Sequence, residues 1–162
     1  MRLEGSCHCG ALRFNLESRH PYPFNLCYCS ICRKTSGGGG FAINLSGAHE
    51  TLEVEGSENL RVYQATVQYP GEPSPHQSPG MRHFCGICGT HLFLWDPRWP
   101  ELVHPLASAI DTALPRPPER THLLLDSKAA WVDVRADSQD KLHPEFPEES
   151  IAEWHQRLGL ER

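Results

Sequence analysis

The chain has 162 residues, 39% of them hydrophobic and 22% charged, with a formal net charge of −5. A chain of this length can bury a sizeable core without cross-links, so we expect a single domain over residues 1–162. The acidic balance and the lack of a basic run exclude nucleic acid as a partner, because phosphate binding needs a basic face. No segment approaches the roughly 20 apolar residues of a membrane span, which excludes a membrane partner.

The first residues, MRLEGSC, contain no apolar signal region. The sequence therefore predicts a cytoplasmic protein in a reducing compartment. In that compartment clustered cysteines indicate metal or redox chemistry more often than disulfides.

Short apolar runs recur along the chain and predict β-strands. Leu12, Phe14 and Leu16 alternate with polar residues at the period of two of a half-buried strand. Similar runs follow, separated by turn residues, at 41–45, 60–63, 91–95, 122–125 and 131–134. Together with 14 prolines and 13 glycines, they predict an all-β fold of short antiparallel strands.

Two segments differ from this strand pattern. Residues 68–80 (QYPGEPSPHQSPG) carry four prolines and two glycines, which predicts a surface loop beside the cysteine site. The C-terminal extension, about 142–160, places Ile151, Trp154 and Leu158 on one helical face, with Pro147 near the start and Gly159 at the end. This spacing predicts one helix of about three turns, docked on the sheet by Trp154.

The seven cysteines form three groups. They are Cys7-x-Cys9, Cys27-x-Cys29-x-x-Cys32 and Cys85-x-x-Cys88. Cysteines one or two residues apart can bind the same ion, because the short loop brings both sulfurs to about 2.3 Å from the metal. Gly10, Gly86 and Gly89 adjoin these pairs and allow the backbone to turn tightly.

Seven cysteines suggest two zinc ions, one bound by four ligands and one by three. Two separated pairs make a tetrahedron, so Cys7, Cys9, Cys85 and Cys88 are the natural structural site. Cys27, Cys29 and Cys32 come from one loop and leave a fourth position vacant, which is typical of catalytic zinc. Three thiolates make the ion a weak Lewis acid, so we expect it to bind a substrate thiolate more readily than it ionises water.

Spacing alone leaves alternatives open. The pair Cys85 and Cys88 could be redox-active, or the cysteines could form disulfides. A single zinc could leave three buried cysteines spare. A histidine could close the second site, with His8, His83 and His91 as local candidates.

Two features adjoin the three-cysteine loop. Arg33 and Lys34 follow Cys32 directly and could bind a substrate carboxylate; ordinary solvated charges are the alternative. The run 37–40 contains four glycines. It could let a ligand lie against bare backbone, or it could be only a flexible strand entrance.

The neighbours of the cysteines resemble a known family. The segments GSCHCGALRF (5–14), CYCSICRK (27–34) and FCGICGT (84–90) are similar to the glutathione-dependent formaldehyde-activating enzymes, a family that includes centromere protein V. LDSKAAW (125–131) also resembles the family's late D-S-K-A-P-W segment, with Ala130 in place of proline. The resemblance covers about residues 4–134.

The resemblance implies an Mss4-like zinc-binding β fold. By the family pattern, Cys7, Cys9, Cys85 and Cys88 hold a structural zinc, and Cys27, Cys29 and Cys32 hold the catalytic zinc. The implied reaction joins formaldehyde to glutathione, giving S-(hydroxymethyl)glutathione, so the chain would be a zinc-dependent carbon–sulfur lyase with a small thiol as its partner. The alternative is a non-catalytic, zinc-stabilised binding module. Methionine-sulfoxide-reductase-like chemistry is disfavoured, because every cysteine is already used as a ligand.

Overall fold

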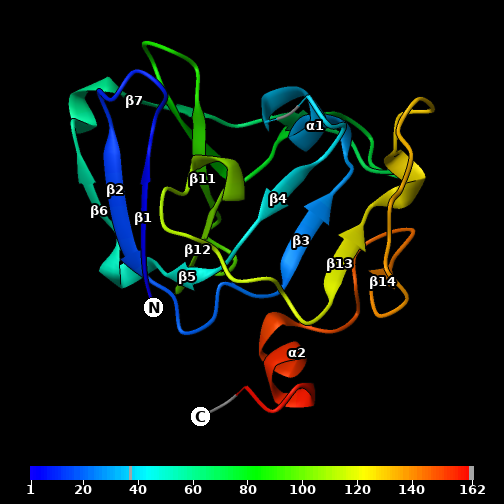
Figure 1. Ribbon diagram of the computed structural model, residues 1–162. Helices are drawn as coiled ribbons and strands as arrows, with labels where there is room; N and C mark the ends of the chain where they lie inside the picture. Colours follow the sequence, from blue (N-terminus) through cyan, green and yellow to red (C-terminus); the bar gives the residue numbers. More distant parts are fainter. Residues whose placement is uncertain (37, 161–162) are drawn as a thin grey trace.

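The computed structural model describes residues 1–36 and 38–160 and contains three β-sheets and a two-stranded ribbon (Figure 1). Most neighbouring strands are antiparallel, so the predicted all-β class is confirmed. The described residues also contain the short helix α1 (Ser30–Ser36), which was not predicted, and the C-terminal helix α2 (Ile151–Arg157). No helix in this part of the chain has the length and apolar character needed to cross a membrane.

The first sheet pairs the N-terminal strands. Its order is β1 (Arg2–Ser6), β2 (Arg13–Glu17) and β6 (Glu53–Glu55). The alternation that predicted a strand at residues 12–16 is confirmed by β2, where Phe14 and Leu16 are buried and Arg13 is exposed. Strand β1 was not predicted, because Leu3 is its one large apolar residue.

The second sheet has five strands. Its order is β5 (Gly47–Ala48), β12 (Leu102–Pro105), β11 (His91–Trp95), β10 (Met81–Cys85) and β7 (Leu60–Tyr63). The strands predicted at 60–63 and 91–95 are confirmed as β7 and β11. All pairs in this sheet are antiparallel.

The predicted loop at 68–80 lies between β7 and β10 and is largely exposed. A ribbon of β8 (Thr66–Val67) and β9 (His76–Gln77) gives it more order than its composition indicated. The Ser78 N–H donates to the Ala65 carbonyl oxygen at 2.8 Å and closes the base of the loop.

The third sheet has the order β14 (Lys141–Leu142), β13 (Arg120–Leu123), β3 (Phe24–Cys27) and β4 (Ala42–Asn44). Strand β13 runs parallel to both of its neighbours, which is an exception to the expected antiparallel arrangement. The prediction at 41–45 is confirmed by β4. Strand β13 therefore places residues from the last third of the chain beside the strand that leads into the three-cysteine loop.

Two strand predictions near the C-terminus need correction. The run 122–125 leaves the sheet after Leu123, because Leu124 adopts a left-handed conformation with φ 58° and starts a turn. Residues 131–134 form no strand. The apolar pattern there reflects the burial of Val132 against Leu26 and Tyr28, in an irregular segment.

Single-turn 3-10 helices connect several strands. They are η1 (His49–Thr51), η2 (Ser57–Asn59), η3 (Ala107–Ala109) and η4 (Leu125–Ser127).

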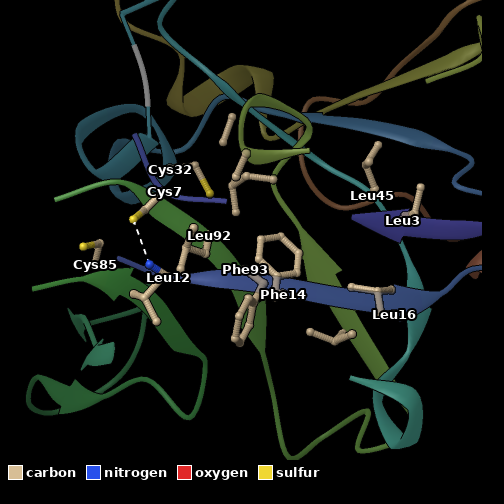
Figure 2. Close-up of a cluster of buried hydrophobic side chains, with 14 of the residues drawn as sticks. Leu3, Cys7, Leu12, Phe14, Leu16, Cys32, Leu45, Cys85, Leu92 and Phe93 are labelled. Atoms are coloured by element: carbon tan, nitrogen blue, oxygen red, sulfur yellow. Dashed lines mark hydrogen bonds between the residues drawn. The ribbon is translucent and has the colours of Figure 1, made fainter. Parts of the chain in front are cut away.

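One hydrophobic core joins the three sheets (Figure 2). Phe14 from the first sheet packs edge-on against Phe93 from the second, with the ring centres 5.5 Å apart. Cys7 and Cys85 belong to this core and lie at the end occupied by Leu12 and Leu92 (Figure 2). Cysteines that could bind a metal are therefore also packing residues of the interior.

Helix α2 has two turns, shorter than the predicted three. A capping box fixes its start, in which the Ser150 hydroxyl accepts from the Glu153 N–H and the Glu153 carboxylate accepts from the Ser150 N–H. Gly159, at φ 66°, ends it as predicted. Trp154 is buried, with its ring centre 6.2 Å from that of Tyr22, so the helix docks by this side chain as expected, but against the segment before β3 and not on a strand of the sheet.

Replacing Trp154 with alanine should therefore lower the free energy of unfolding by about 3–5 kcal/mol, the usual cost of removing a buried aromatic ring. Denaturant unfolding of the metal-loaded protein measures the loss. Trp154→Phe is the matched control, because it keeps most of the volume and removes an indole N–H that has no hydrogen-bond partner. Equal stability of Trp154→Ala and the wild type would contradict the docking role.

Candidate metal centres

The structure brings four cysteines together at the predicted structural site. The sulfurs of Cys7, Cys9, Cys85 and Cys88 lie within 4.8 Å of one another. The Cys7 and Cys9 sulfurs are 3.5 Å apart, and those of Cys9 and Cys85 are 3.8 Å apart. A tetrahedral zinc with Zn–S bonds of about 2.3 Å puts its sulfurs about 3.8 Å from one another. The donor set and its spacing therefore fit a zinc ion.

Backbone groups support this four-cysteine group. The Leu12 N–H donates to the Cys7 sulfur at 3.2 Å, and the Ile87 N–H donates to the Cys85 sulfur at 3.4 Å. Hydrogen bonds to a sulfur stabilise its thiolate form. Gly10 and Gly89 have φ of 75° and 76°, so the expected tight turns are present at both pairs.

Thr90 joins the two halves of the four-cysteine group. Its hydroxyl accepts from the His8 N–H at 3.2 Å and lies 3.2 Å from the Cys88 sulfur. The hydrogen bond from Thr90 lowers the pKa of Cys88 to about 5. Since Cys7 and Cys9 follow β1 while Cys85 ends β10, an ion held here would clamp the first sheet to the second.

The second group consists of Cys27, Cys29 and Cys32, whose sulfurs also lie within 4.8 Å of one another. Cys27 ends β3, and Cys32 lies in α1, whose first turn directs its sulfur back toward Cys29. The Cys32 N–H donates to the Cys29 sulfur at 3.3 Å. Cys27 and Cys32 are buried and Cys29 is partly exposed, so the group is reached from the Cys29 side.

Without a metal, the three thiols do not ionise together. Hydrogen bonds from Cys27 and Cys32 lower the pKa of Cys29 to about 2. Cys27 responds in the opposite direction: its hydrogen bonds with Cys29 and Cys32 raise its pKa far above the usual value. One negative charge therefore settles on Cys29, and further ionisation is opposed by like charge and burial. A bound cation is what would allow all three sulfurs to act as thiolates.

The three candidate histidines lie outside both groups. Within the described residues, the clusters contain only cysteine. His8 is exposed, and His83 stacks on Phe93 with ring centres 4.6 Å apart. The Nδ1 atom of His91 is hydrogen-bonded to the Ser36 hydroxyl. The structure therefore favours a three-thiolate group over one that a histidine closes.

Two features follow the three-cysteine loop, the basic pair Arg33 and Lys34 and the glycine run 37–40. Lys34 is exposed, whereas Arg33 is partly buried and its Nε has no hydrogen-bond partner. Gly37 lies outside the described residues. Gly40 has φ 87°, and a Cβ atom on it would collide with Val132. Close packing therefore accounts for a glycine at position 40.

Arg82 is a site neighbour that the sequence did not reveal. It lies in the middle of β10 and is 8% exposed, and its Nε and Nη1 atoms have no hydrogen-bond partner. The hydrogen bond with Cys27 lowers the pKa of Cys32, but the hydrogen bond with Cys29 and burial outweigh it and raise this pKa to about 11; the positive charge of Arg82 opposes the rise. Burial lowers the pKa of His91 to about 4, and Arg82 contributes to this shift. A buried cation with free donors thus adjoins the three-cysteine group.

Comparison with known proteins shows the family of this chain. The sequence model of the family "Glutathione-dependent formaldehyde-activating enzyme" matches residues 2–125. The chain belongs to this family. A Halomonas elongata protein that is named provisionally as a glutathione-dependent formaldehyde-activating enzyme is 61% identical over 161 residues, which cover 99% of each chain. A crystal structure of a Rhodobacter sphaeroides protein superposes with a TM-score of 0.53 at 27% identity, covering 70% of this chain and 92% of the other.

The two cysteine groups should respond differently to substitution. We expect Cys85→Ser to prevent folding, because a structural zinc contributes about 10–16 kcal/mol of apparent binding free energy. Cys29→Ser should leave a folded protein that has lost one of its two metal ions. Metal analysis and circular dichroism of both variants check this. One zinc in the wild type, or equal unfolding of both variants, would contradict the division into two kinds of site.

Proposed function

We propose that this family member is a zinc-dependent carbon–sulfur lyase of the S-(hydroxymethyl)glutathione synthase type, acting on formaldehyde and glutathione. The observation that carries the proposal is the three-cysteine group, which is reached from one side and contains no fourth protein ligand among the described residues. Membership of the family and the name of the Halomonas relative support glutathione and formaldehyde as substrates. The reducing cytoplasm suits seven cysteines of which none is in a disulfide.

The two groups would hold one zinc ion each, and the two ions would have different roles. Cys7, Cys9, Cys85 and Cys88 supply four ligands, which leaves no position for a substrate, so this site would be structural. Cys27, Cys29 and Cys32 supply three, which leaves one position for an exchangeable ligand, so this site would be catalytic.

The zinc ion would supply a Lewis acid that lowers the pKa of a bound thiol and keeps it as a thiolate at neutral pH. The chain's contribution is to hold the three cysteine sulfurs on one side and leave access past Cys29. In the reaction the glutathione sulfur attacks the carbonyl carbon of formaldehyde. A carbon–sulfur bond forms, the carbon–oxygen π bond breaks, and the oxygen takes up a proton, so all atoms of both substrates appear in S-(hydroxymethyl)glutathione.

Arg82 would balance the charge of this complex. Three thiolates and one Zn²⁺ carry a formal charge of −3 + 2 = −1, and a substrate thiolate makes it −2. Arg82 is buried, its Nε and Nη1 atoms have no hydrogen-bond partner, and its charge acts on Cys32 electrostatically. A cation in a poorly solvated place stabilises added negative charge more strongly than one in water. Arg82 therefore favours a thiolate over water as the fourth ligand.

Exchange measured at equilibrium tests catalysis. Formaldehyde adds to glutathione without help, so product detection alone decides nothing. We expect the wild-type protein to raise the rate of exchange between free and thiol-bound formaldehyde, followed by ¹³C magnetisation transfer, and Cys29→Ser to return it to the uncatalysed rate. No acceleration by a protein that contains two zinc ions would support the non-catalytic module instead.

Arg82→Met tests the charge balance. Glutathione affinity, measured by calorimetry, should fall about 10-fold or more, since hydrogen bonds to charged groups contribute about 1.5–3 kcal/mol. Thermal stability should be unchanged or higher, because the apolar side chain removes two buried donors without partners. Arg2→Met is the control: it removes the same charge from an exposed side chain. Equal glutathione affinity of Arg82→Met and Arg2→Met would contradict this role.

A further inference from the structure

A buried polar chain begins at the residue between two of the cysteines. Tyr28 separates Cys27 from Cys29, and it is 1% exposed. Its hydroxyl lies 2.9 Å from the Nδ1 atom of His122 on β13. The two rings stack with their centres 5.8 Å apart and an angle of 17° between their planes. Tyr28 is thus held both by ring packing and by a directional hydrogen bond.

The chain continues from His122 to the C-terminal segment. His122 is fully buried, and its Nε2 atom makes no hydrogen bond but lies 3.5 Å from Oδ2 of Asp140, within ion-pair distance. Asp140 accepts from the Arg120 backbone N–H at 2.8 Å, the Arg120 Nε at 2.9 Å and the Asp137 N–H at 2.9 Å. The carboxylate is therefore fixed in place by groups on β13 and on the turn before β14.

The charges determine which partner donates in the hydrogen bond between Tyr28 and His122. Burial lowers the pKa of His122, so its ring is neutral at pH 7. Burial opposes ionisation of Asp140, but the hydrogen bonds from Arg120 outweigh it and hold the pKa of Asp140 below its usual value. A carboxylate beside Nε2 favours the tautomer with a proton on Nε2, which leaves Nδ1 as an acceptor. The Tyr28 hydroxyl therefore donates to His122.

The polar chain of Tyr28, His122 and Asp140 reaches the three-cysteine loop from the side opposite to the sulfurs. Cys27, Cys29 and Cys32 pack into the main core, whereas the Tyr28 ring belongs to a separate cluster with Leu26 and Val132. Successive side chains of an extended segment point to opposite faces. A fixed Tyr28 ring consequently fixes the direction in which the sulfurs on both sides of it point.

We propose that Tyr28, His122 and Asp140 are positioning residues of the three-cysteine centre, so that a segment beyond the family-matched residues 2–125 belongs to that centre. The inference rests on the proposed function, since it concerns the metal that Cys27, Cys29 and Cys32 would hold. Packing alone would not require the Tyr28 hydroxyl, because a phenylalanine at position 28 would fill the same space and leave no polar group to satisfy. Outer partners of metal ligands typically change metal affinity or activity 10- to 100-fold.

The test uses the full-length protein loaded with ¹¹³Cd in place of zinc. Thiolate number and geometry set the ¹¹³Cd chemical shift, so the four-cysteine and three-cysteine groups give separate resonances. Tyr28→Phe removes one oxygen atom, and Asp140→Asn removes the charge at the far end of the chain. Glu119→Gln is the matched control, because Glu119 is also a buried carboxylate paired with an arginine, but its partner Arg157 lies on α2 and leads away from Tyr28.

We expect Tyr28→Phe and Asp140→Asn to shift or broaden the three-cysteine resonance alone, and to weaken metal binding there by about 10- to 100-fold in competition with a chelator. Glu119→Gln should leave both resonances in place. If Tyr28→Phe and Asp140→Asn behave like Glu119→Gln, the chain is only structural and the inference is wrong. If the wild type shows a single, four-cysteine resonance, the proposed function fails, and the inference fails with it.

Discussion

Four sulfurs from two distant parts of the chain, those of Cys7, Cys9, Cys85 and Cys88, meet where the first sheet adjoins the second. Cys7 and Cys85 are core residues, so the same atoms that would bind a cation also close the hydrophobic interior at one end. The Leu12 and Ile87 N–H groups donate hydrogen bonds to the sulfurs of Cys7 and Cys85. Core packing and any metal binding at this group therefore involve the same residues.

The second group depends on its surroundings in a different way. Cys27, Cys29 and Cys32 lie within six residues, so the loop brings them together by itself, but a short loop ahead of a two-turn helix does not fix their orientation. We infer that orientation comes from outside the loop, from the contact of Tyr28 with His122 of β13, while the charge of Arg82 on β10 acts on Cys32. The three cysteines are thus brought together by their closeness in sequence, while residues from distant strands influence the geometry and charge of the group.

The sequence predicted the features that depend on local spacing. The cysteine groups, the strands β2, β4, β7 and β11, and the helix ended by Gly159 all follow from patterns within a few residues. The sequence did not predict Arg82 or the chain from Tyr28 to Asp140, because an arginine in a strand and a histidine in an apolar run give no sign of which distant residue they face. The parallel pairing of β13 and the left-handed Leu124 were missed for the same reason, since tertiary contacts decide both.

The parallel pairing of β3 with β13 also governs the order in which the molecule can be completed. Tyr28 and His122 are 94 positions apart, and Asp140 comes later still. During synthesis from the N-terminus, the loop with Cys27, Cys29 and Cys32 leaves the ribosome long before the residues that support it. Thiol ligands are available to a metal ion at that stage, but the geometry of the finished site is reached only when the last quarter of the chain has been made. At the proposed metal centre, capture of an ion and the setting of its final coordination would thus be separate events in time.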